Sequence, residues 1–460
     1  MKTYDIIVIG SGGGSKITTP ASKLGYKVAI IEKDSLGGTC LNRGCIPSKM
    51  LIYPADVTHE IRDAHKFNID VPTEVSTDFA SLVSRVTETI TKESDSIIPL
   101  YEKNPNIDYY RGKATFVSNK VVAVNGDDLT ADKIFIAVGS RPMIPNIPGL
   151  AGTPYITSTE ALRNTVLPKK MLVLGAGYIA VELGHAYASF GCEVHFLVRS
   201  TFLRREDRDI RQEFDRVFST RHHVHREVTL SSVSYTQNQF HIMIKDKQGK
   251  EKILDADAFL IAAGVVPNSG QLGLENTDVT LNDKGFIKVD DQLQTGANGV
   301  YALGDCIGNY LFRHSVNFEG EYLMKTLFVE KSDKPISYPP VPHAVFTLPQ
   351  IAGVGKTEDE LEQEGGEYVV GLNAYKDSAM GMARLSDHGF VKILVDKKLR
   401  RLLGAHIIGD EASDMIHVLI AFMTANATVD DLLSMIYIHP ALPEIVRNAA
   451  RKAKAALDQT

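Results

Sequence analysis

The chain has few cysteines, no tryptophan and no long apolar run. Only four of its 460 residues are cysteine, at Cys40, Cys45, Cys192 and Cys306, which is too few for the disulfide framework of a small secreted protein. No apolar stretch approaches the ~20 residues that a helix needs to span a bilayer. The first residues enter the apolar segment TYDIIVIG without the charged leader of a signal peptide. These absences predict a cytoplasmic protein that has no membrane partner.

An excess of charge of one sign is also lacking. The 50 basic and 56 acidic residues give a net charge of −6, and they form no basic tract, so a nucleic-acid partner is not expected. A chain of 460 residues is long enough for roughly two to four domains. The hydrophobic fraction of 44% is typical of a globular protein with a large core.

The N-terminal residues predict a nucleotide-binding unit. The apolar run 4–9 is typical of a buried strand; a glycine-rich turn, a helical segment to about Leu24 and a second strand ending at Glu32 follow. In a Rossmann-type unit, glycines let the backbone approach a pyrophosphate, and the acid after the second strand binds the adenosine ribose. Ser15 stands where a third glycine is usual, but serine is small enough for close packing. The glycines predicted to contact the cofactor are Gly10, Gly12, Gly13 and Gly14.

The same pattern recurs in the middle of the chain. Residues 170–175 predict a strand, 175–180 a turn with Gly175 and Gly177, and 181–191 a helix. The next strand ends at residue 198. Two dinucleotide-binding units in one chain imply two nucleotide cofactors, most simply a flavin and a nicotinamide.

The second unit lacks the acid that ends the first. Arg199 stands in its place, and Arg204 and Arg205 follow. An acid suits the 2′-hydroxyl of NAD, whereas an arginine suits the 2′-phosphate of NADP, so NADPH is expected in preference to NADH. The alternative is a solvated basic turn that is balanced by the nearby acids Glu206, Asp207 and Asp209.

Other parts of the chain carry different patterns. Residues 109–138 are rich in strand-forming residues and include an Asn-Gly-Asp hairpin turn. The segment 259–268 repeats the pattern of 134–142. From about residue 337 the chain changes character, with an antiparallel hairpin predicted over 391–409 and helices after it.

Half of the cysteines lie in one glycine-rich turn, GGTCLNRGCIPSK at residues 37–49. Cys40 and Cys45 could be structural, metal ligands, free buried thiols or a redox-active pair. A metal needs about four ligands, and the other two cysteines complete no such set, so no metal site is predicted. The redox interpretation is favoured because Cys45 opens a predicted helix, where a thiolate is stabilised. Arg43 and Lys49 add positive charge.

Taken together, these motifs resemble those of the flavoprotein disulfide reductases, the group of dihydrolipoamide dehydrogenase, glutathione reductase and mycothione reductase. The resemblance includes the flavin fingerprint at 4–32 and the cysteine turn. Its further motifs are AVGSRP at 137–142, GAGYIAVE at 175–182, AAGVVPN at 262–268, YALGD at 301–305 and HPALPE at 439–444.

The resemblance implies an α/β fold with two Rossmann-type dinucleotide-binding domains and a C-terminal α+β dimerisation domain. The FAD-binding domain is expected in two parts, 1–150 and 269–336. The NAD(P)-binding domain is expected at 151–268 and the dimerisation domain at 337–460.

The resemblance also implies roles for individual residues. Cys40 is expected to be the interchange thiol that attacks substrate, and Cys45 the flavin-side thiol that forms a charge-transfer pair with oxidised flavin. Lys49 is expected near the flavin N5, paired with Glu182. Asp305 is expected to bind the ribityl chain. Further cofactor contacts are expected from Gly139, Gly264 and Tyr178, the last as an aromatic gate over the nicotinamide pocket.

His439 and Glu444 match the acid–base dyad of the family. The histidine protonates the departing thiolate, and the glutamate fixes the ring and stabilises its charged form. In the family this dyad reaches into the site of the partner subunit, so the resemblance implies a homodimer.

The implied activity is that of an FAD-containing, NAD(P)-dependent disulfide oxidoreductase. It resembles dihydrolipoamide dehydrogenase, which passes electrons between a nicotinamide, FAD, a disulfide and a thiol or disulfide substrate. An NADPH-dependent reductase of a low-molecular-weight disulfide is the alternative. Two other classes are a flavin oxidase or peroxidase, against which the cysteine pair argues, and a lipoyl-carrier-binding component of a multienzyme complex. No motif identifies the substrate.

Overall fold

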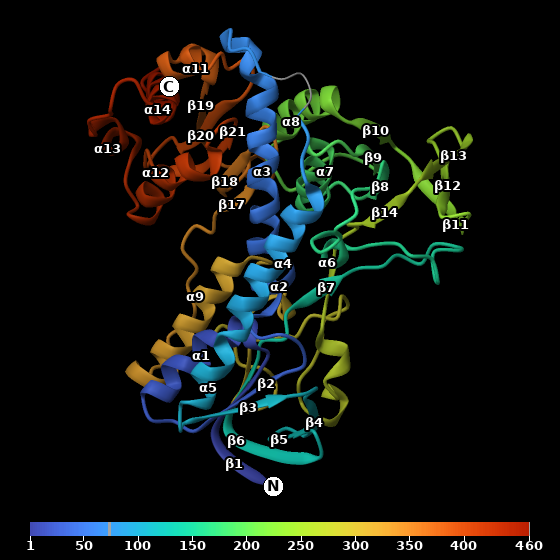
Figure 1. Ribbon diagram of the computed structural model, residues 1–460. Helices are drawn as coiled ribbons and strands as arrows, with labels where there is room; N and C mark the ends of the chain where they lie inside the picture. Colours follow the sequence, from blue (N-terminus) through green and yellow to red (C-terminus); the bar gives the residue numbers. More distant parts are fainter. Residues whose placement is uncertain (72–74, 460) are drawn as a thin grey trace.

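The computed structural model describes residues 1–71 and 75–459. Its elements form three parts, each built around a principal β-sheet (Figure 1). In Figure 1 the first part lies at the bottom, the second at the right and the third at the upper left, and the long helix α3 (Cys45–Asp63) runs between the first and the third. The predicted α/β class, with two Rossmann-type units and a C-terminal α+β part, is confirmed.

The first sheet combines strands from two distant stretches of the chain. Its strands are β1 (Lys2–Ile9), β2 (Val28–Glu32), β3 (Ile107–Arg111), β4 (Thr115–Ser118), β5 (Val121–Val124), β6 (Asp127–Ile136) and β16 (Val300–Ala302). The order is β3-β2-β1-β6-β5-β4, and β16 pairs with β6. The pairs β4–β5 and β5–β6 are antiparallel, and the predicted hairpin turn joins β5 to β6. The other strand pairs of this sheet are parallel. The predicted domain boundaries at residues 150, 268 and 336 stay predictions.

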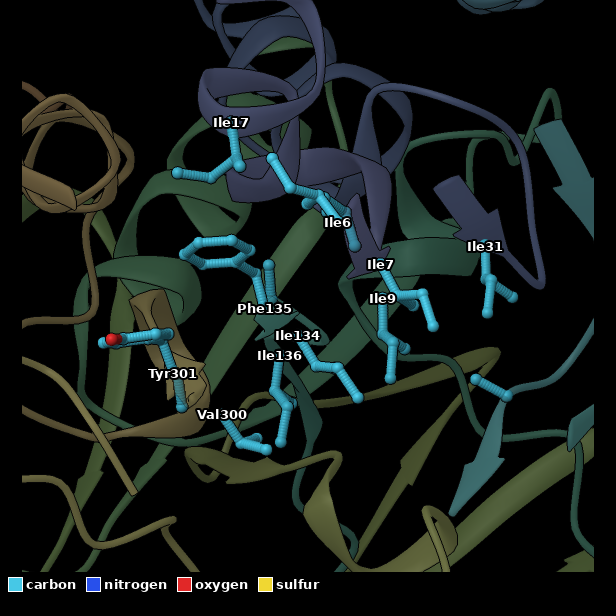
Figure 2. Close-up of a cluster of buried hydrophobic side chains, with 14 of the residues drawn as sticks. Ile6, Ile7, Ile9, Ile17, Ile31, Ile134, Phe135, Ile136, Val300 and Tyr301 are labelled. Carbon is cyan, nitrogen blue, oxygen red and sulfur yellow. The ribbon is translucent and has the colours of Figure 1, made fainter. Parts of the chain in front are cut away.

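Apolar side chains on both faces bury this sheet (Figure 2). Ile6 of β1 and Ile134 and Phe135 of β6 are completely buried. Burial on both faces explains why these strands are almost continuous apolar runs and do not alternate. Val300 and Tyr301 of β16 lie in the same cluster (Figure 2), so the late strand shares the core of the early ones.

The second sheet has four parallel strands in the order β10-β9-β8-β14. They are β8 (Lys170–Leu174), β9 (Glu193–Val198), β10 (His223–Arg226) and β14 (Ala258–Ile261). A separate antiparallel sheet lies beside it, formed by β11 (Thr229–Thr236), β12 (Gln239–Lys245) and β13 (Glu251–Ala256). Because β8 and β9 are parallel neighbours, their carboxyl ends lie side by side, where a Rossmann-type unit binds its nucleotide.

Two short strands connect the first and second parts. β7 (Ser140–Pro142) follows β6, β15 (Val265–Pro267) follows β14, and the two pair antiparallel. The similarity between the segments 134–142 and 259–268 therefore has a structural reason, because each is the end of a parallel strand followed by one strand of this ribbon.

The third part is an antiparallel sheet in the order β17-β18-β21-β20-β19. Its strands are β17 (His343–Val345), β18 (Ile351–Gly355), β19 (Tyr368–Ala374), β20 (Phe390–Asp396) and β21 (Leu402–Ile408). Strands β20 and β21 confirm the predicted hairpin over 391–409. Helices α12 (Ala412–Thr424), α13 (Val429–Ser434) and α14 (Pro443–Leu457) follow.

The remaining helices connect or cover the sheets. They are α1 (Ser11–Lys23), α2 (Gly38–Arg43), α4 (Phe79–Asp95), α5 (Ile97–Glu102), α6 (Ser158–Ala161), α7 (Tyr178–Ser189), α8 (Arg208–Arg221), α9 (Arg313–Met324), α10 (Glu358–Gln363) and α11 (Ala379–Ala383). Among the helices of the described residues, none is both long enough and apolar enough to cross a membrane.

Three predicted turns are wrong in detail. Helix α1 already begins at Ser11, α7 begins at Tyr178 instead of Val181, and Cys40 lies in the short helix α2. Glycine in general disfavours a helix. At the start of α1, however, close packing requires residues without side chains. A Cβ built on Gly13 would lie 2.4 Å from Val316, and one built on Gly14 would lie 2.4 Å from Val8.

A buried lysine joins the second and third parts. Lys392 of β20 is completely buried, and its Nζ lies 2.7 Å from Asp207 and 2.6 Å from Asp209, at the start of α8. Glu358 is its third partner, at 2.5 Å. Breaking such a buried cluster by removing one charge costs about 3–5 kcal/mol. The cluster therefore holds two of the acids that the sequence had placed near Arg199.

Candidate active site

The two cysteines lie at the junction of α2 and α3. Cys40 is in α2, Cys45 is the first residue of α3, and Gly44 between the helices is the N-cap of α3. A Cβ on Gly44 would lie 2.9 Å from the carbonyl oxygen of Thr39, so the close approach of the two helices favours glycine there. Cys40 is half-buried and Cys45 is exposed, and both are free thiols. The helix start at Cys45 was predicted and is confirmed.

The two thiols share one hydrogen bond, and it sets their acidity. The Cys45 thiol donates to the Cys40 sulfur, which lowers the pKa of Cys40 to about 7. The same contact raises the pKa of Cys45. At pH 7 roughly half of the Cys40 thiols are therefore ionised, and this thiolate is the form that attacks a disulfide.

Arg313, the first residue of α9, adds a positive charge that no motif indicated. After the hydrogen bond from Cys45, it is the strongest influence that lowers the pKa of Cys40. Its guanidinium would lie 4.0 Å from a Cβ built on Gly12 of α1. Arg313 therefore lies between the reactive thiol and the helix N-terminus predicted to bind a pyrophosphate.

The acidity of Cys40 leads to a direct prediction. In the reduced protein, the rate at which iodoacetamide alkylates Cys40 is expected to rise about tenfold per pH unit below pH 7 and to level off above it, because only the thiolate reacts. Peptide mass analysis over pH 5–9 measures the rate. In a Cys45→Ala variant the donor is lost, so the midpoint is expected to move to higher pH. An unchanged midpoint would show that Cys45 does not set the acidity of Cys40.

Behind the cysteines, Lys49 of α3 forms an ion pair with Glu182 of α7. Lys49 Nζ lies 2.7 Å from Glu182 Oε2 and 4.2 Å from the centre of the Phe346 ring. The other oxygen of Glu182 accepts a 3.0 Å hydrogen bond from the backbone N–H of Phe346. Burial raises the pKa of Glu182, and Lys49 opposes that shift. The predicted pair is present, and it holds the ammonium group of Lys49 in one place.

The start of α1 fits the pyrophosphate of FAD. The N-cap residue Gly10 has no side chain to cap this helix, and Glu32 binds the N–H of Ser11, so the N–H groups that follow Ser11 are the ones available to an anion. Gly10 passes so close to Ala137 that a Cβ would lie 2.4 Å from the carbonyl oxygen. Gly12 faces Gly38, whose Cα would lie 3.4 Å from a built Cβ. The absence of side chains at these positions lets neighbouring backbone pack closely against the helix start.

Glu32 is held beside the same helix start. Its Oε2 accepts hydrogen bonds from the Ser11 backbone N–H (2.9 Å) and the Ser11 Oγ (2.8 Å), and its Oε1 accepts one from the backbone N–H of Asp34 (3.0 Å). A carboxylate can accept about four hydrogen bonds. Glu32 therefore keeps capacity for a ribose hydroxyl.

Asp305 lies beside the other end of the predicted flavin site. It belongs to the short turn after β16 and accepts a 2.6 Å hydrogen bond from Ser140 Oγ. Burial raises the pKa of Asp305. Gly139, next to Ser140, has φ of 64° and turns the chain where β6 ends.

The start of α7 is where the second nucleotide site is predicted. Gly177 is its N-cap, and no side chain within the described residues caps the helix. Gly175 passes Ala262 so closely that a Cβ would lie 2.2 Å from the carbonyl oxygen. Gly175 N–H also lies 3.4 Å from the carbonyl oxygen of Leu197, near the end of β9, so the residues that follow β9 lie beside this helix start.

Arg199 and Arg204 follow β9, and both are exposed. Neither forms an ion pair within the part of the chain that the structure describes. The nearby acids are engaged elsewhere, because Glu206 lies 2.8 Å from His343 and Asp207 contacts Lys392. These acids therefore do not pair with Arg199 or Arg204, and the solvated basic turn stays an alternative to a 2′-phosphate site.

Tyr178 is the first residue of α7. Burial raises the pKa of Tyr178 to about 12, and the charges of Asp305 and Glu182 add to the shift, although part of the ring faces solvent. Gly264, with φ of 127°, lies at the turn between β14 and β15. The role of Tyr178 as a gate stays a prediction.

His439 and Glu444 form a pair, but not next to the cysteines of the same chain. His439 Nδ1 lies 3.0 Å from Glu444 Oε2. Glu444 is buried, while 71% of the His439 side chain is exposed. The pair follows α13 at the upper left of Figure 1, far from α2. Arg447, one turn further along α14, contacts Glu444 at 2.8 Å and helps to fix the carboxylate. Hydrogen bonding to His439 lowers the pKa of Glu444.

Comparison with known families decides the classification. The profile of the pyridine nucleotide-disulphide oxidoreductases matches residues 4–321, and that of their dimerisation domain matches residues 341–450. The chain belongs to this family. It is therefore an oxidoreductase, and FAD and a pyridine nucleotide are typical cofactors of the family.

Relatives of this oxidoreductase match over nearly their whole length. A mycothione reductase of Mycobacterium tuberculosis is 36% identical over 98% of this chain and 99% of its own. A dihydrolipoyl dehydrogenase of Trypanosoma brucei brucei is 32% identical over 97% of this chain and 95% of its own. A Cu(II) complex of the HOCl-induced flavoprotein disulfide reductase RclA from Escherichia coli is 28% identical, with a TM-score of 0.87 over 98% of this chain and 99% of that one.

Three residues of the oxidoreductase site were not predicted. Arg313 acts on Cys40, Phe346 binds Glu182 and Arg447 binds Glu444, each from outside the recognised motifs. Arg447 had one available signal, since it lies three residues after Glu444 on a helix and so shares its face. Nothing in the sequence pattern indicates the other two, because only the fold brings α9 and the segment after β17 to the cysteines.

Proposed function

We propose that the chain is an NADPH-dependent reductase of a low-molecular-weight disulfide, working through FAD and the Cys40–Cys45 pair. The observation that carries this proposal is the exposed, unpaired state of Arg199 and Arg204 in the described structure, beside the start of α7. Two arginines there suit the 2′-phosphate of NADPH. The match to a mycothione reductase supports the same substrate class.

The proposed roles of the residues follow from the thiol chemistry. Bound FAD would carry two electrons from the nicotinamide to the cysteine pair. The Cys40 thiolate then attacks the substrate disulfide, forming a mixed disulfide and releasing one substrate thiolate. Cys45 attacks the Cys40 sulfur and releases the second substrate thiol. The substrate gains two electrons and two protons, and the Cys40–Cys45 disulfide is restored.

His439 is proposed to protonate the departing thiolate, acting from the second subunit of a homodimer. Glu444 and Arg447 would hold its ring position. Ile436 and Ile438, close to His439 in the chain, are 96% and 80% exposed, and apolar side chains of this kind suit a subunit interface. The matched dimerisation domain supports this arrangement.

Dihydrolipoamide oxidation is the second candidate. The same dithiol chemistry runs in either direction, because a difference of ~30 mV between two reduction potentials corresponds to only about 1.4 kcal/mol for two electrons. The match to a dihydrolipoyl dehydrogenase favours it. A role as a lipoyl-carrier-binding component of a multienzyme complex rests on the same match, and gel filtration with a lipoylated carrier tests it.

Replacing both Arg199 and Arg204 with alanine tests the cofactor assignment. KM for NADPH is expected to rise about 10- to 100-fold, because hydrogen bonds to a charged group contribute about 1.5–3 kcal/mol. KM for NADH should stay within about twofold, since NADH has no 2′-phosphate. Arg451→Ala, at an exposed position of α14, is the control and should change neither. Equal use of both cofactors by the unaltered enzyme contradicts the assignment.

A substrate screen separates the two candidates. The purified enzyme is supplied with NADPH or NADH and the disulfides of mycothiol, glutathione, coenzyme A and lipoamide. We expect the largest kcat/KM for a small disulfide with NADPH. Preference for lipoamide with the NAD couple would support the second candidate instead.

A further inference from the structure

Four potential metal ligands gather on one face of the second sheet, away from the cysteines. Glu193 and His195 are two residues apart on β9, and His223 and His225 are two residues apart on β10. Residues two apart in a strand point to the same face. The register places His223 directly beside His195. We call these residues the β9–β10 histidine cluster.

The side chains of the cluster are close enough to bind one ion. A carboxylate oxygen of Glu193 and ring nitrogens of His195 and His223 lie within 4.8 Å of one another. The rings of His195 and His223 are stacked, with centroids 4.4 Å apart. Glu193 Oε1 lies 2.6 Å from His195 Nε2. Bonds of about 2.0–2.2 Å to a shared ion need only small side-chain movements. Glu193 and His223 are exposed, and Glu193 would exchange its present contacts with Lys170 and His195 for the ion.

His225 orients the buried member of the cluster. His195 is 8% exposed, and its Nδ1 lies 3.0 Å from His225 Nε2. When His195 Nδ1–H donates to His225, the lone pair of His195 Nε2 is directed towards Glu193 and His223. A hydrogen bond of this kind, made by the ring nitrogen that does not bind the ion, is what fixes the ring of a metal-binding histidine.

Two of the imidazoles, those of His195 and His225, favour the neutral form that metal binding requires. Burial lowers the pKa of His225 to about 4 and lowers that of His195 below its usual value. The neighbouring lysines Lys170 and Lys252 act in the same direction.

We propose that the β9–β10 histidine cluster binds one divalent transition-metal ion through Glu193, His195 and His223, with His225 positioning His195. Imidazole and carboxylate together suit Cu²⁺, Zn²⁺ and Ni²⁺, and Cu²⁺ is bound most tightly of these in a site without imposed geometry. The exposed side of the cluster provides the entry path. The ion would join β10, the edge strand, to β9.

This site is separate from the reaction centre. Glu193 begins β9, whereas Arg199 follows its other end, roughly 20 Å away at about 3.3 Å per residue. Binding is therefore expected to stabilise the edge of the sheet and to leave turnover unchanged. The sequence did not predict this site, because its ligands come from β9 and β10, which helix α8 separates in the chain.

The competing interpretation is that Lys170 already satisfies Glu193. Its Nζ lies 3.4 Å from Glu193 Oε1, and the register places Lys170 beside Glu193. The two interpretations make opposite predictions. If the cluster binds metal, Lys170 competes with the ion for Glu193, and Lys170→Met should tighten binding several-fold. If the ion pair is the only function of Glu193, that variant should not affect metal binding.

The test uses the full-length, FAD-loaded protein with Cys40→Ser and Cys45→Ser, so that the active-site thiols cannot capture metal. Titration with Cu²⁺ alone, followed by calorimetry and electron paramagnetic resonance, is expected to show one ion per chain with nitrogen hyperfine structure. His223→Ala, at an exposed position, should weaken binding at least about tenfold. His241→Ala, at a histidine of β12 that pairs with Asp255, is the matched control and should leave affinity unchanged. Absence of binding at one equivalent, or an affinity that His223→Ala does not alter, would overturn the proposal.

Discussion

Replacing Cys40 with serine is expected to reduce disulfide reductase activity at least about a thousandfold, while reduction of the bound flavin by NADPH continues at its normal rate. The reason is that Cys40 carries the only thiolate of the pair near neutral pH, and a serine hydroxyl is not ionised in this range. Removing a nucleophile typically costs this much or more. Stopped-flow absorbance measures flavin reduction, and steady-state NADPH oxidation with a disulfide measures turnover.

Two further variants make this result specific. Cys192→Ala removes a buried thiol outside the site and should retain full activity. Cys45→Ser leaves Cys40 able to attack but removes the thiol that resolves the mixed disulfide. In the reduced variant, mass spectrometry should detect one substrate thiol bound to Cys40. Appearance of that adduct on Cys45 in the Cys40→Ser variant would reverse the assignment of the two thiols.

Replacing His439 with glutamine is expected to slow thiol–disulfide exchange by about 10²- to 10⁴-fold, the usual contribution of a general acid or base. Glutamine keeps a polar side chain but cannot deliver a proton to the departing thiolate. Flavin reduction by NADPH should be nearly unaffected, because the segment between α13 and α14, which contains His439, lies far from α1 and α7 of the same chain (Figure 1). Single-turnover measurements of the two half-reactions separate the effects. His417→Gln, at an exposed histidine of α12, is the control and should behave as the unaltered enzyme does.

Mixed dimers test whether His439 acts on the other subunit. Cys40→Ser and His439→Gln homodimers should each be nearly inactive. A dimer with one subunit of each kind contains one intact site, because an unaltered Cys40 faces an unaltered His439. Random mixing makes about half of the dimers hybrid, so activity should recover to roughly a quarter of the unaltered level. No recovery after verified subunit exchange would place both residues in the site of one chain.

Much of this architecture was predictable because the information is local. The Rossmann-type units, the hairpin over 391–409 and the helix start at Cys45 each depend on neighbouring residues. The Lys49–Glu182 pair was predicted only through a family resemblance, since the two residues are far apart in the chain, and the structure places them 2.7 Å apart.

The parts that could not be predicted depend on tertiary packing. Helix α1 begins within the glycine run because Val8 and Val316 leave no room for side chains there, and Val316 lies on a helix from the other end of the chain. Arg313 lies on the same helix, α9, and comes close to Cys40 only in the folded chain. In the sequence, Glu206 and Asp207 lie close to Arg199. In the folded chain, Asp207 pairs with the buried Lys392 of β20, and Glu206 pairs with His343 of β17.

Counting free thiols before and after NADPH treatment shows whether electrons pass through a Cys40–Cys45 disulfide. The air-oxidised, FAD-loaded enzyme is denatured in an alkylating reagent, with and without anaerobic NADPH treatment, and the labelled peptides are identified. We predict that Cys192 and Cys306 are labelled without NADPH and that all four cysteines are labelled after it. Labelling of all four before NADPH, or no change on its addition, would contradict electron transfer through a Cys40–Cys45 disulfide.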